Sequence, residues 1–296
     1  MRSFLARQTR RLVVGSFFSA IGSSAYAETA NAPQSLTFLD SHRIGNKQAG
    51  FREPSGLAFV AGSGALWSVS DNTPAAFRLE IGGDLNGPAL DIPGLEDPEG
   101  VAWDATGGRL LILSEKAASV FVLSIDPAGP TTEVALLDMD NAQILVDALG
   151  GDPGGLSPEG ITLDPQTGQV YVVNERNPRI LIEISSDLRT ILNVEQLLDT
   201  RGFWSAGVSD WHLDVSGLSY DHRRDGLWIA SDVGKCVYFL PLNGSLASKI
   251  DLAWTDGGEV RRVDNAEGLS LNAVGNRLFV VSDDGKHSRV FTYSIE

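Results

Sequence analysis

Carboxylate side chains recur at two fixed places in this sequence, and they are the residues best suited to chemistry. A glutamate stands directly before a glycine in three segments, as Glu99, Glu159 and Glu267. Serine takes the same place in two further segments, as Ser55 and Ser216. A second set of acids follows a small polar residue at the end of an apolar run; its members are Asp71, Glu115, Glu175, Asp232 and Asp283. Carboxylate oxygens are the ligands that hard divalent cations such as calcium prefer.

Both sets of acids belong to one sequence unit that occurs five times. In each unit a glycine opens an apolar stretch, a turn follows, and a second apolar stretch ends in the small polar residue and the acid. A third apolar stretch comes after a loop. The opening glycines are 44 to 60 residues apart and comprise Gly56, Gly100, Gly160, Gly217 and Gly268. Repeats of roughly 40–50 residues with several short strands are typical of β-propellers.

We therefore predict an all-β fold, a five-bladed β-propeller over residues 35–296, with blades that begin near residues 52, 96, 157, 214 and 265. The fifth unit ends with its third strand and lacks a fourth, whereas residues 35–40 form an unassigned strand-like segment. We expect this segment to complete the last blade, because closing the ring removes exposed strand edges. A loose N-terminal arm is the alternative. A short helix is expected at 142–149, within an insertion.

The order of strands in a propeller blade predicts where the acids lie. The first strand lines the axis and forms a hairpin with the second, so the start of one and the end of the other share a face. All eight carboxylates should then gather at one mouth of the tunnel, where like charges repel each other unless a cation is bound. Calcium, which takes six to eight oxygens, is expected rather than magnesium. The alternative for the five second-strand acids is that they accept backbone N–H groups of the following turns.

An aromatic insertion is expected on the same face. Residues 200–213 contain Phe203, Trp204, Trp211 and His212. A flat surface formed by these aromatic rings would favour a protein partner. His212 is a candidate base, although a lone histidine beside tryptophan is more often a hydrogen-bonded or packed residue. The binding-face candidates are Ser55, Ser216, Trp204, Trp211 and His212.

The N-terminal segment has the features of an export signal. Residues 1–27 combine four arginines, an apolar run and a small-residue cleavage site, which is typical of a secretory signal peptide. Arg10 and Arg11 resemble, incompletely, a twin-arginine signal. Residues 28–34 form a linker. We expect the mature protein in the periplasm or secreted, without a membrane span; anchoring in the inner membrane by an uncleaved signal is the alternative.

The net charge limits the kinds of molecule that the protein can bind, and the cysteine count limits its disulfides. The formal net charge of −15 becomes about −19 once the signal, with its four arginines and no acid, is removed. So acidic a domain is unsuited to bind nucleic acid and suits cations or a basic partner. Cys236 is the only cysteine, which excludes an intramolecular disulfide and predicts a small buried side chain.

The segments around the opening glycines resemble the SdiA-regulated, or YjiK-like, family over about residues 34–295. The phrases that carry the likeness include Pro98-Glu99-Gly100-Val101, Pro158-Glu159-Gly160-Ile161 and Ala266-Glu267-Gly268-Leu269. The resemblance implies an exported or envelope-associated five-bladed propeller with a calcium site. It favours a role in calcium-dependent binding, signalling or calcium homeostasis in the cell envelope over catalysis. The small molecule or protein that would be bound is left open.

Two further resemblances suggest an enzyme. The strand entries are similar to those of gluconolactonase and regucalcin propellers, which implies a catalytic divalent ion, but serine stands at two entries here. Propeller phytases and esterase-like proteins are also similar in being acidic, exported and calcium-loaded. A calcium-dependent hydrolase of phosphate or carboxylic esters, in which the ion activates a water, is thus the alternative function. No Gly-x-Ser-x-Gly motif is present to support a serine nucleophile.

Overall fold

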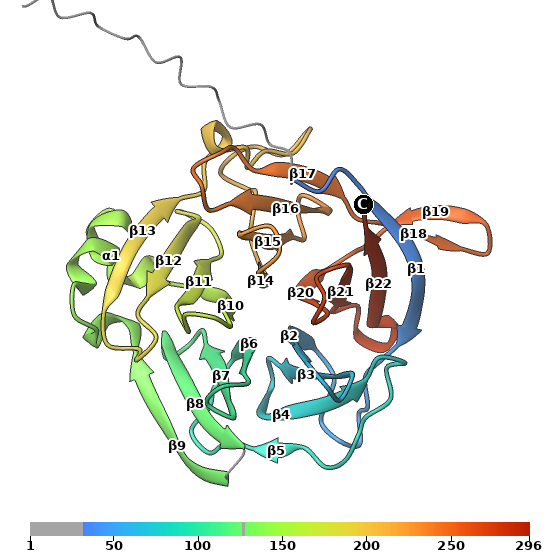
Figure 1. Ribbon diagram of the computed structural model, residues 1–296, viewed down its shortest axis with the longest axis horizontal. Helices are drawn as coiled ribbons and strands as arrows, with labels where there is room; N and C mark the ends of the chain where they lie inside the picture. Colours follow the sequence, from blue (N-terminus) through green and yellow to red (C-terminus); the bar gives the residue numbers. More distant parts are fainter. Residues whose placement is uncertain (1–31, 126–127) are drawn as a thin grey trace, which may run out of the picture. The chain divides into compact units, whose positions relative to one another are not determined.

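Five four-stranded antiparallel sheets surround one central axis, as Figure 1 shows in a view along that axis. The computed structural model describes residues 32–125 and 128–296; the predicted signal peptide and most of the predicted linker lie outside these ranges. The prediction of a five-bladed β-propeller is confirmed.

The blades follow one another along the chain, each running from the axis outward. Blade 1 contains β2 (Pro54–Val60), β3 (Ala65–Ser70), β4 (Thr73–Glu80) and β5 (Leu90–Asp91). Blade 2 contains β6 (Pro98–Asp104), β7 (Arg109–Ser114), β8 (Ser119–Ile125) and β9 (Ala128–Ala135). Blade 3 contains β10 (Pro158–Leu163), β11 (Val170–Asn174), β12 (Ile180–Ile184) and β13 (Ile191–Gln196). Blade 4 contains β14 (Leu218–Asp221), β15 (Gly226–Ser231), β16 (Cys236–Pro241) and β17 (Ser248–Asp251).

Blade 5 joins the two ends of the described chain. It contains β20 (Ala266–Leu271), β21 (Arg277–Ser282) and β22 (Arg289–Ile295), and β1 (Leu36–Arg43) is its outer strand. β1 pairs with β22 antiparallel from Leu36 opposite Ile295 to Arg43 opposite Arg289. The predicted closure by the N-terminal strand is therefore confirmed, and the loose-arm alternative is wrong.

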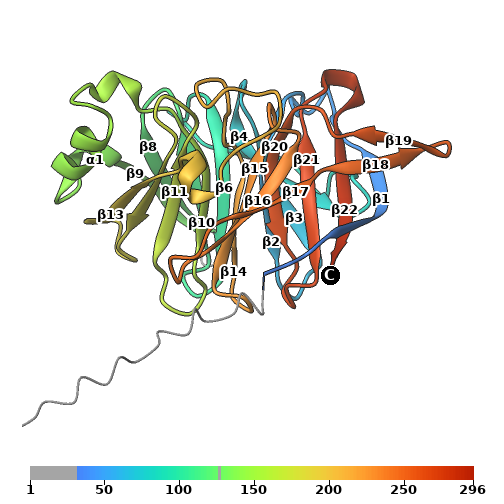
Figure 2. The ribbon, with the colours of Figure 1, turned by 90° about the horizontal axis from the view of Figure 1, so that it is seen from above.

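Two insertions project from the outer wall of the ring in both Figure 1 and Figure 2. One carries α1 (Ala142–Ala148), which confirms the predicted helix, and the other is the hairpin of β18 (Ala253–Asp256) and β19 (Glu259–Arg262). Short 3-10 helices occupy Leu136–Asp138, Pro153–Gly155, Asp199–Arg201 and Gly285–His287. None of the helices in the described ranges has the length and apolar character needed to cross a membrane.

The hydrophobic core lies between the blades rather than within one central cluster. Five clusters of buried side chains fill the five interfaces between adjacent blades. The middle strands β3, β11, β15 and β16 are buried at every position, because a neighbouring blade covers each of their faces. Cys236 is among these buried residues, as predicted.

At the axis, the five opening glycines bring each blade into backbone contact with the next. A Cβ atom added to Gly217 would lie 2.7 Å from the Cα of Gly268, and one added to Gly100 would lie 2.8 Å from the carbonyl oxygen of Glu159. Gly56, Gly160 and Gly268 would meet the backbone of the following blade in the same way. Only glycine permits this approach, so the contacts form a closed ring.

We predict that Gly217→Ala lowers the free energy of unfolding by about 3 kcal/mol, because the added methyl overlaps backbone atoms that cannot rotate away. Gly82 is a matched control, since a Cβ there meets nothing within 4 Å. Gly82→Ala should change the same quantity by less than about 0.5 kcal/mol. Denaturant unfolding of the two variants, followed by tryptophan fluorescence, measures the difference; equal effects would contradict the glycine-ring account.

Candidate functional site

One cavity of about 390 Å³ at one end of the axis collects all eight carboxylates singled out in the sequence. Ser55 and Ser216 also line it, together with Asp214, Val233 and Arg176. The lining thus contains nine carboxylates and a single basic side chain. We refer to it as the carboxylate cavity.

Irregular strand pairing places the three glutamates at the mouth of the tunnel. The register of β10 against β11 shifts between Pro158 and Gly160, which leaves Glu159 outside the regular ladder. The same irregularity occurs at the entries of blades 1, 2 and 5. Bulges of this kind redirect a side chain, and each glutamate or serine that precedes an opening glycine lines the cavity.

In two of the five blades, the turn after the second strand is bonded by the serine that precedes the acid rather than by the acid. Ser114 Oγ accepts a hydrogen bond from the backbone N–H of Ala117 at 3.2 Å, and Ser231 Oγ accepts one from Gly234 at 2.9 Å. Asp283 differs, because its own carboxylate accepts from the backbone N–H of Gly285 at 3.1 Å. The turn-forming alternative therefore describes Asp283 well and the acids after Ser114 and Ser231 poorly.

Burial and mutual repulsion raise the pKa of all three glutamates. Burial, followed by the charge of Glu99, raises the pKa of Glu159 to about 10. Burial and then Glu115 raise the pKa of Glu99 to about 8, and burial and then Asp232 raise the pKa of Glu267 to about 8.

One carboxylate oxygen of the cavity lining is buried without a hydrogen-bond partner. Asp71 Oδ1 is buried and has no hydrogen-bond partner among the described residues. Burial, followed by a side-chain hydrogen bond with Glu53, raises the pKa of Asp71 to about 7. The one basic group of the lining, Arg176, forms an ion pair with Glu175. The donor set therefore fits a hard cation that supplies the positive charge the protein lacks there.

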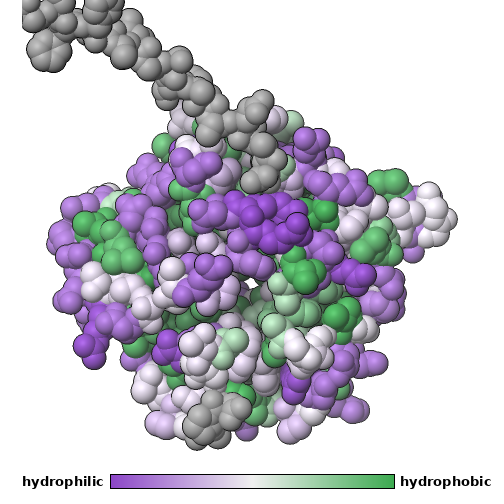
Figure 3. Space-filling model, in the orientation of Figure 1, coloured by the Kyte–Doolittle hydropathy of each residue, from purple (hydrophilic) through white to green (hydrophobic). Residues whose placement is uncertain are grey.

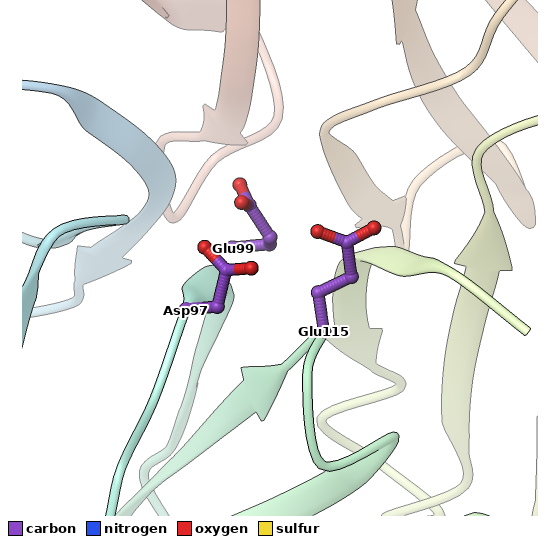
Figure 4. Close-up of side chains that lie close together, drawn as sticks. All are labelled: Asp97, Glu99 and Glu115. Carbon is purple, nitrogen blue, oxygen red and sulfur yellow. The ribbon is translucent and has the colours of Figure 1, made fainter.

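Two acids of this region, Asp97 and Asp214, were not singled out as ligands from the sequence. Oxygen atoms of Asp97, Glu99 and Glu115 all lie within 4.8 Å of one another, and Figure 4 shows the three side chains. Asp97 has a left-handed backbone, with φ of 53°. Asp97 stands three residues before the opening glycine of its repeat. The equivalent residues of the fourth and fifth repeats are also polar, Asp214 and Asn265. That recurrence is the signal by which Asp97 and Asp214 could have been found.

The aromatic insertion does not form the predicted flat face. Phe203 is fully buried and packs against Tyr238 with ring centroids 4.7 Å apart, so its expected part in that face is wrong. Trp204 and Trp211 are 55% and 67% exposed. His212 Nδ1 is hydrogen-bonded to the Ser209 hydroxyl at 2.6 Å. Trp204, Trp211 and His212 do not line the carboxylate cavity, whereas Ser55 and Ser216 do.

Comparisons with known proteins identify relatives of the whole domain. The family model described as SdiA-regulated matches residues 41–286. The glutaminyl cyclase of Myxococcus xanthus is similar over 90% of this chain and 99% of its own, with 13% identity and a TM-score of 0.56. A chain of a nidogen/laminin complex is similar over 78% of this chain and 72% of its own, with 16% identity and a TM-score of 0.50. Identities this low concern the fold alone.

The raised pKa values predict how stability depends on pH in the presence of a chelator. The ordinary pKa of a glutamate is 4.5, so between about pH 5 and 8 the unfolded chain loses protons that folded Glu99, Glu159 and Glu267 retain. The free energy of unfolding then falls as the pH rises, by up to about 1.4 kcal/mol per pH unit for each such group. The thermal midpoint measured from pH 5 to 8 in EGTA should decrease accordingly.

Glu159→Gln should reduce this decrease and give a higher midpoint than the wild type at pH 8. Glu183→Gln, at a partly exposed position outside the carboxylate cavity, should leave the decrease unchanged. A pH-independent midpoint in the wild type, or equal behaviour of the two variants, would show that the cavity carboxylates do not repel one another as described.

Proposed function

The chain belongs to the SdiA-regulated family, and we propose that it is an exported calcium-binding β-propeller of the cell envelope. Its role would be calcium-dependent binding or signalling, or calcium homeostasis. The observation that supports this most directly is the carboxylate cavity, in which nine acids and one guanidinium face a common space. Calcium binding would relieve the repulsion among these acids and supply a partner for their oxygens.

Calcium suits this cavity better than magnesium does. Calcium accepts six to eight oxygens in flexible geometry, whereas magnesium demands a near-ideal octahedron at shorter distances. Glu99, Glu159 and Glu267 would hold the ion near the axis, and the hydroxyls of Ser55 and Ser216 are neutral oxygen donors in the two remaining blades. The acids at the second-strand ends lie farther from the axis, and they would complete the ligand set or attract the ion.

A calcium-dependent hydrolase of phosphate or carboxylic esters is the second candidate, supported by a cavity with room for a small ester beside an ion. Within the described ranges, no histidine lines this cavity, and Arg176 is its single cationic side chain. Lys116 pairs with Glu96, and Lys235 pairs with Asp232 and Asp264. A phosphate-binding role therefore has less support than cation binding alone.

The envelope location rests on the sequence of residues 1–27, with its arginines, apolar run and cleavage site. The periplasm or the cell exterior is the proposed compartment, and anchoring in the inner membrane by an uncleaved signal remains its alternative. Calcium is abundant outside the cytoplasm, so a site of modest affinity would suffice there.

Isothermal titration calorimetry of the chelator-treated mature protein tests the proposal. Calcium should give saturable binding, and Glu159→Gln should weaken the affinity at least about tenfold, because one charged ligand is lost. Glu183→Gln should bind calcium like the wild type, and magnesium should bind more weakly to all three proteins.

Absence of calcium binding to a folded wild-type protein would contradict the proposal. Equal weakening by Glu159→Gln and Glu183→Gln would contradict the location of the site. Calcium-dependent turnover in a panel of ester and phosphate substrates, lost in Glu159→Gln, would favour the hydrolase.

A further inference from the structure

A second cavity, of about 280 Å³, opens at the opposite end of the axis. The halves of β2, β6, β10, β14 and β20 that follow the opening glycines contribute to its lining. The constriction lined by the five glycines is too narrow for a water molecule, so it separates this cavity from the carboxylate cavity. Figure 3 shows this face, where apolar side chains border the central opening on its lower and right sides.

Three hydroxyl groups line this second cavity from consecutive blades. Thr162, Ser219 and Ser270 stand two residues after the opening glycine in blades 3, 4 and 5, and each is more than nine-tenths buried. Each hydroxyl oxygen accepts a backbone N–H from the next blade: from Tyr220 at 3.0 Å, Leu271 at 3.2 Å and Phe59 at 2.9 Å. A hydroxyl that accepts such a bond still has its own hydrogen to donate.

These hydroxyls have no acceptor for that hydrogen within the part of the chain that the structure describes. Blades 1 and 2 carry alanine at the same position, Ala58 and Ala102. One side of the cavity therefore offers three hydrogen-bond donors, while the other side offers none from these positions. This asymmetry would orient a ligand that has an acceptor at one end and an apolar body at the other.

Aromatic rings form part of the wall one residue further along the strands. Phe59, Trp103 and Tyr220 line the cavity. Phe59 is stacked on Phe279 at an interplanar angle of 5°, and Tyr220 is stacked on Tyr171 at 10°. Rings held in this way are fixed before a ligand arrives, which reduces the entropy lost on binding. Flat aromatic groups pack well against such walls.

This cavity differs from the carboxylate cavity in the charge of its lining. Among the described residues, its lining contains no aspartate, glutamate, lysine or arginine. His222 and Asn272 are the other polar side chains of the lining, so an ion entering the cavity would lose hydration without meeting an aspartate, glutamate, lysine or arginine, which is unfavourable. An uncharged occupant is therefore favoured. Since an apolar cavity of about 150 Å³ already binds benzene, a single substituted aromatic ring fits the available space.

We propose that this second cavity binds a small, uncharged aromatic molecule that carries a carbonyl oxygen, with the oxygen toward Thr162, Ser219 and Ser270 and the ring toward Phe59 and Trp103. The site is independent of cation binding in the carboxylate cavity, from which the glycine constriction separates it.

Ligand-observed fluorine NMR with para-fluoroacetophenone and para-fluoroethylbenzene tests this site, because the two probes share a shape and only the first has a carbonyl. The wild type should bind the ketone roughly fivefold more tightly, as expected for one hydrogen bond of ordinary strength. Ser219→Ala and Ser270→Ala together should reduce that preference, because only the Thr162 hydroxyl then remains, while para-fluoroethylbenzene still binds. Ser245→Ala, outside the cavity, should keep the wild-type preference.

The hydroxyls also join neighbouring blades, so the double variant must first show a cooperative thermal transition. Where it fails to fold, Ala102→Ser adds a fourth hydroxyl at the equivalent position and should increase the preference for the ketone. Adding calcium should leave both affinities unchanged. The proposal is overturned if neither probe binds, if the wild type shows no preference, or if the preference is undiminished in the folded double variant or is unaffected by Ala102→Ser.

Discussion

Five glycines at the axis form the constraint on which the rest of the structure depends. Their contacts bring the backbone of each blade against the next, from Gly56 round to Gly268 and back to Ser55. Because no side chain fits there, the residue on either side of each glycine faces an open end of the tunnel. The preceding residue lines the carboxylate cavity, and the residues that follow line the hydroxyl-bearing cavity. One steric requirement thus separates two cavities of opposite chemistry.

The carboxylate cavity is unfavourable for folding and is held in place by the interfaces between blades. Burial raises the pKa of Glu159 to about 10, so its carboxylate is destabilised at neutral pH. The five apolar clusters between the blades and the pairing of β1 with β22 provide the stability that permits this. Local instability at a site, supported by a rigid scaffold, is typical of ligand-binding centres.

Sequence alone predicted the features that the repeat determines and missed those that depend on packing between blades. The spacing of the glycines was sufficient to place the blades, the closing strand and the shared face of the acids. Phe203 was expected on the surface together with the other aromatic residues of its insertion, yet it fills a core position against Tyr238. Asp97 was not singled out because it does not stand directly before the opening glycine, and only the structure places its oxygen within 4.8 Å of those of Glu99 and Glu115. The sequence did not distinguish Thr162 and Ser219 from other strand residues, and only the structure shows that they line a cavity.

A crystal structure of the mature protein grown with calcium tests the central claim most directly, since it locates the ion as well as detecting it. The account predicts density for a cation in the carboxylate cavity, with oxygens of Glu99, Glu159 or Glu267 at about 2.3–2.6 Å, and loss of that density in Glu159→Gln. A carboxylate cavity that contains only water at saturating calcium, or calcium bound elsewhere on the protein, would contradict it.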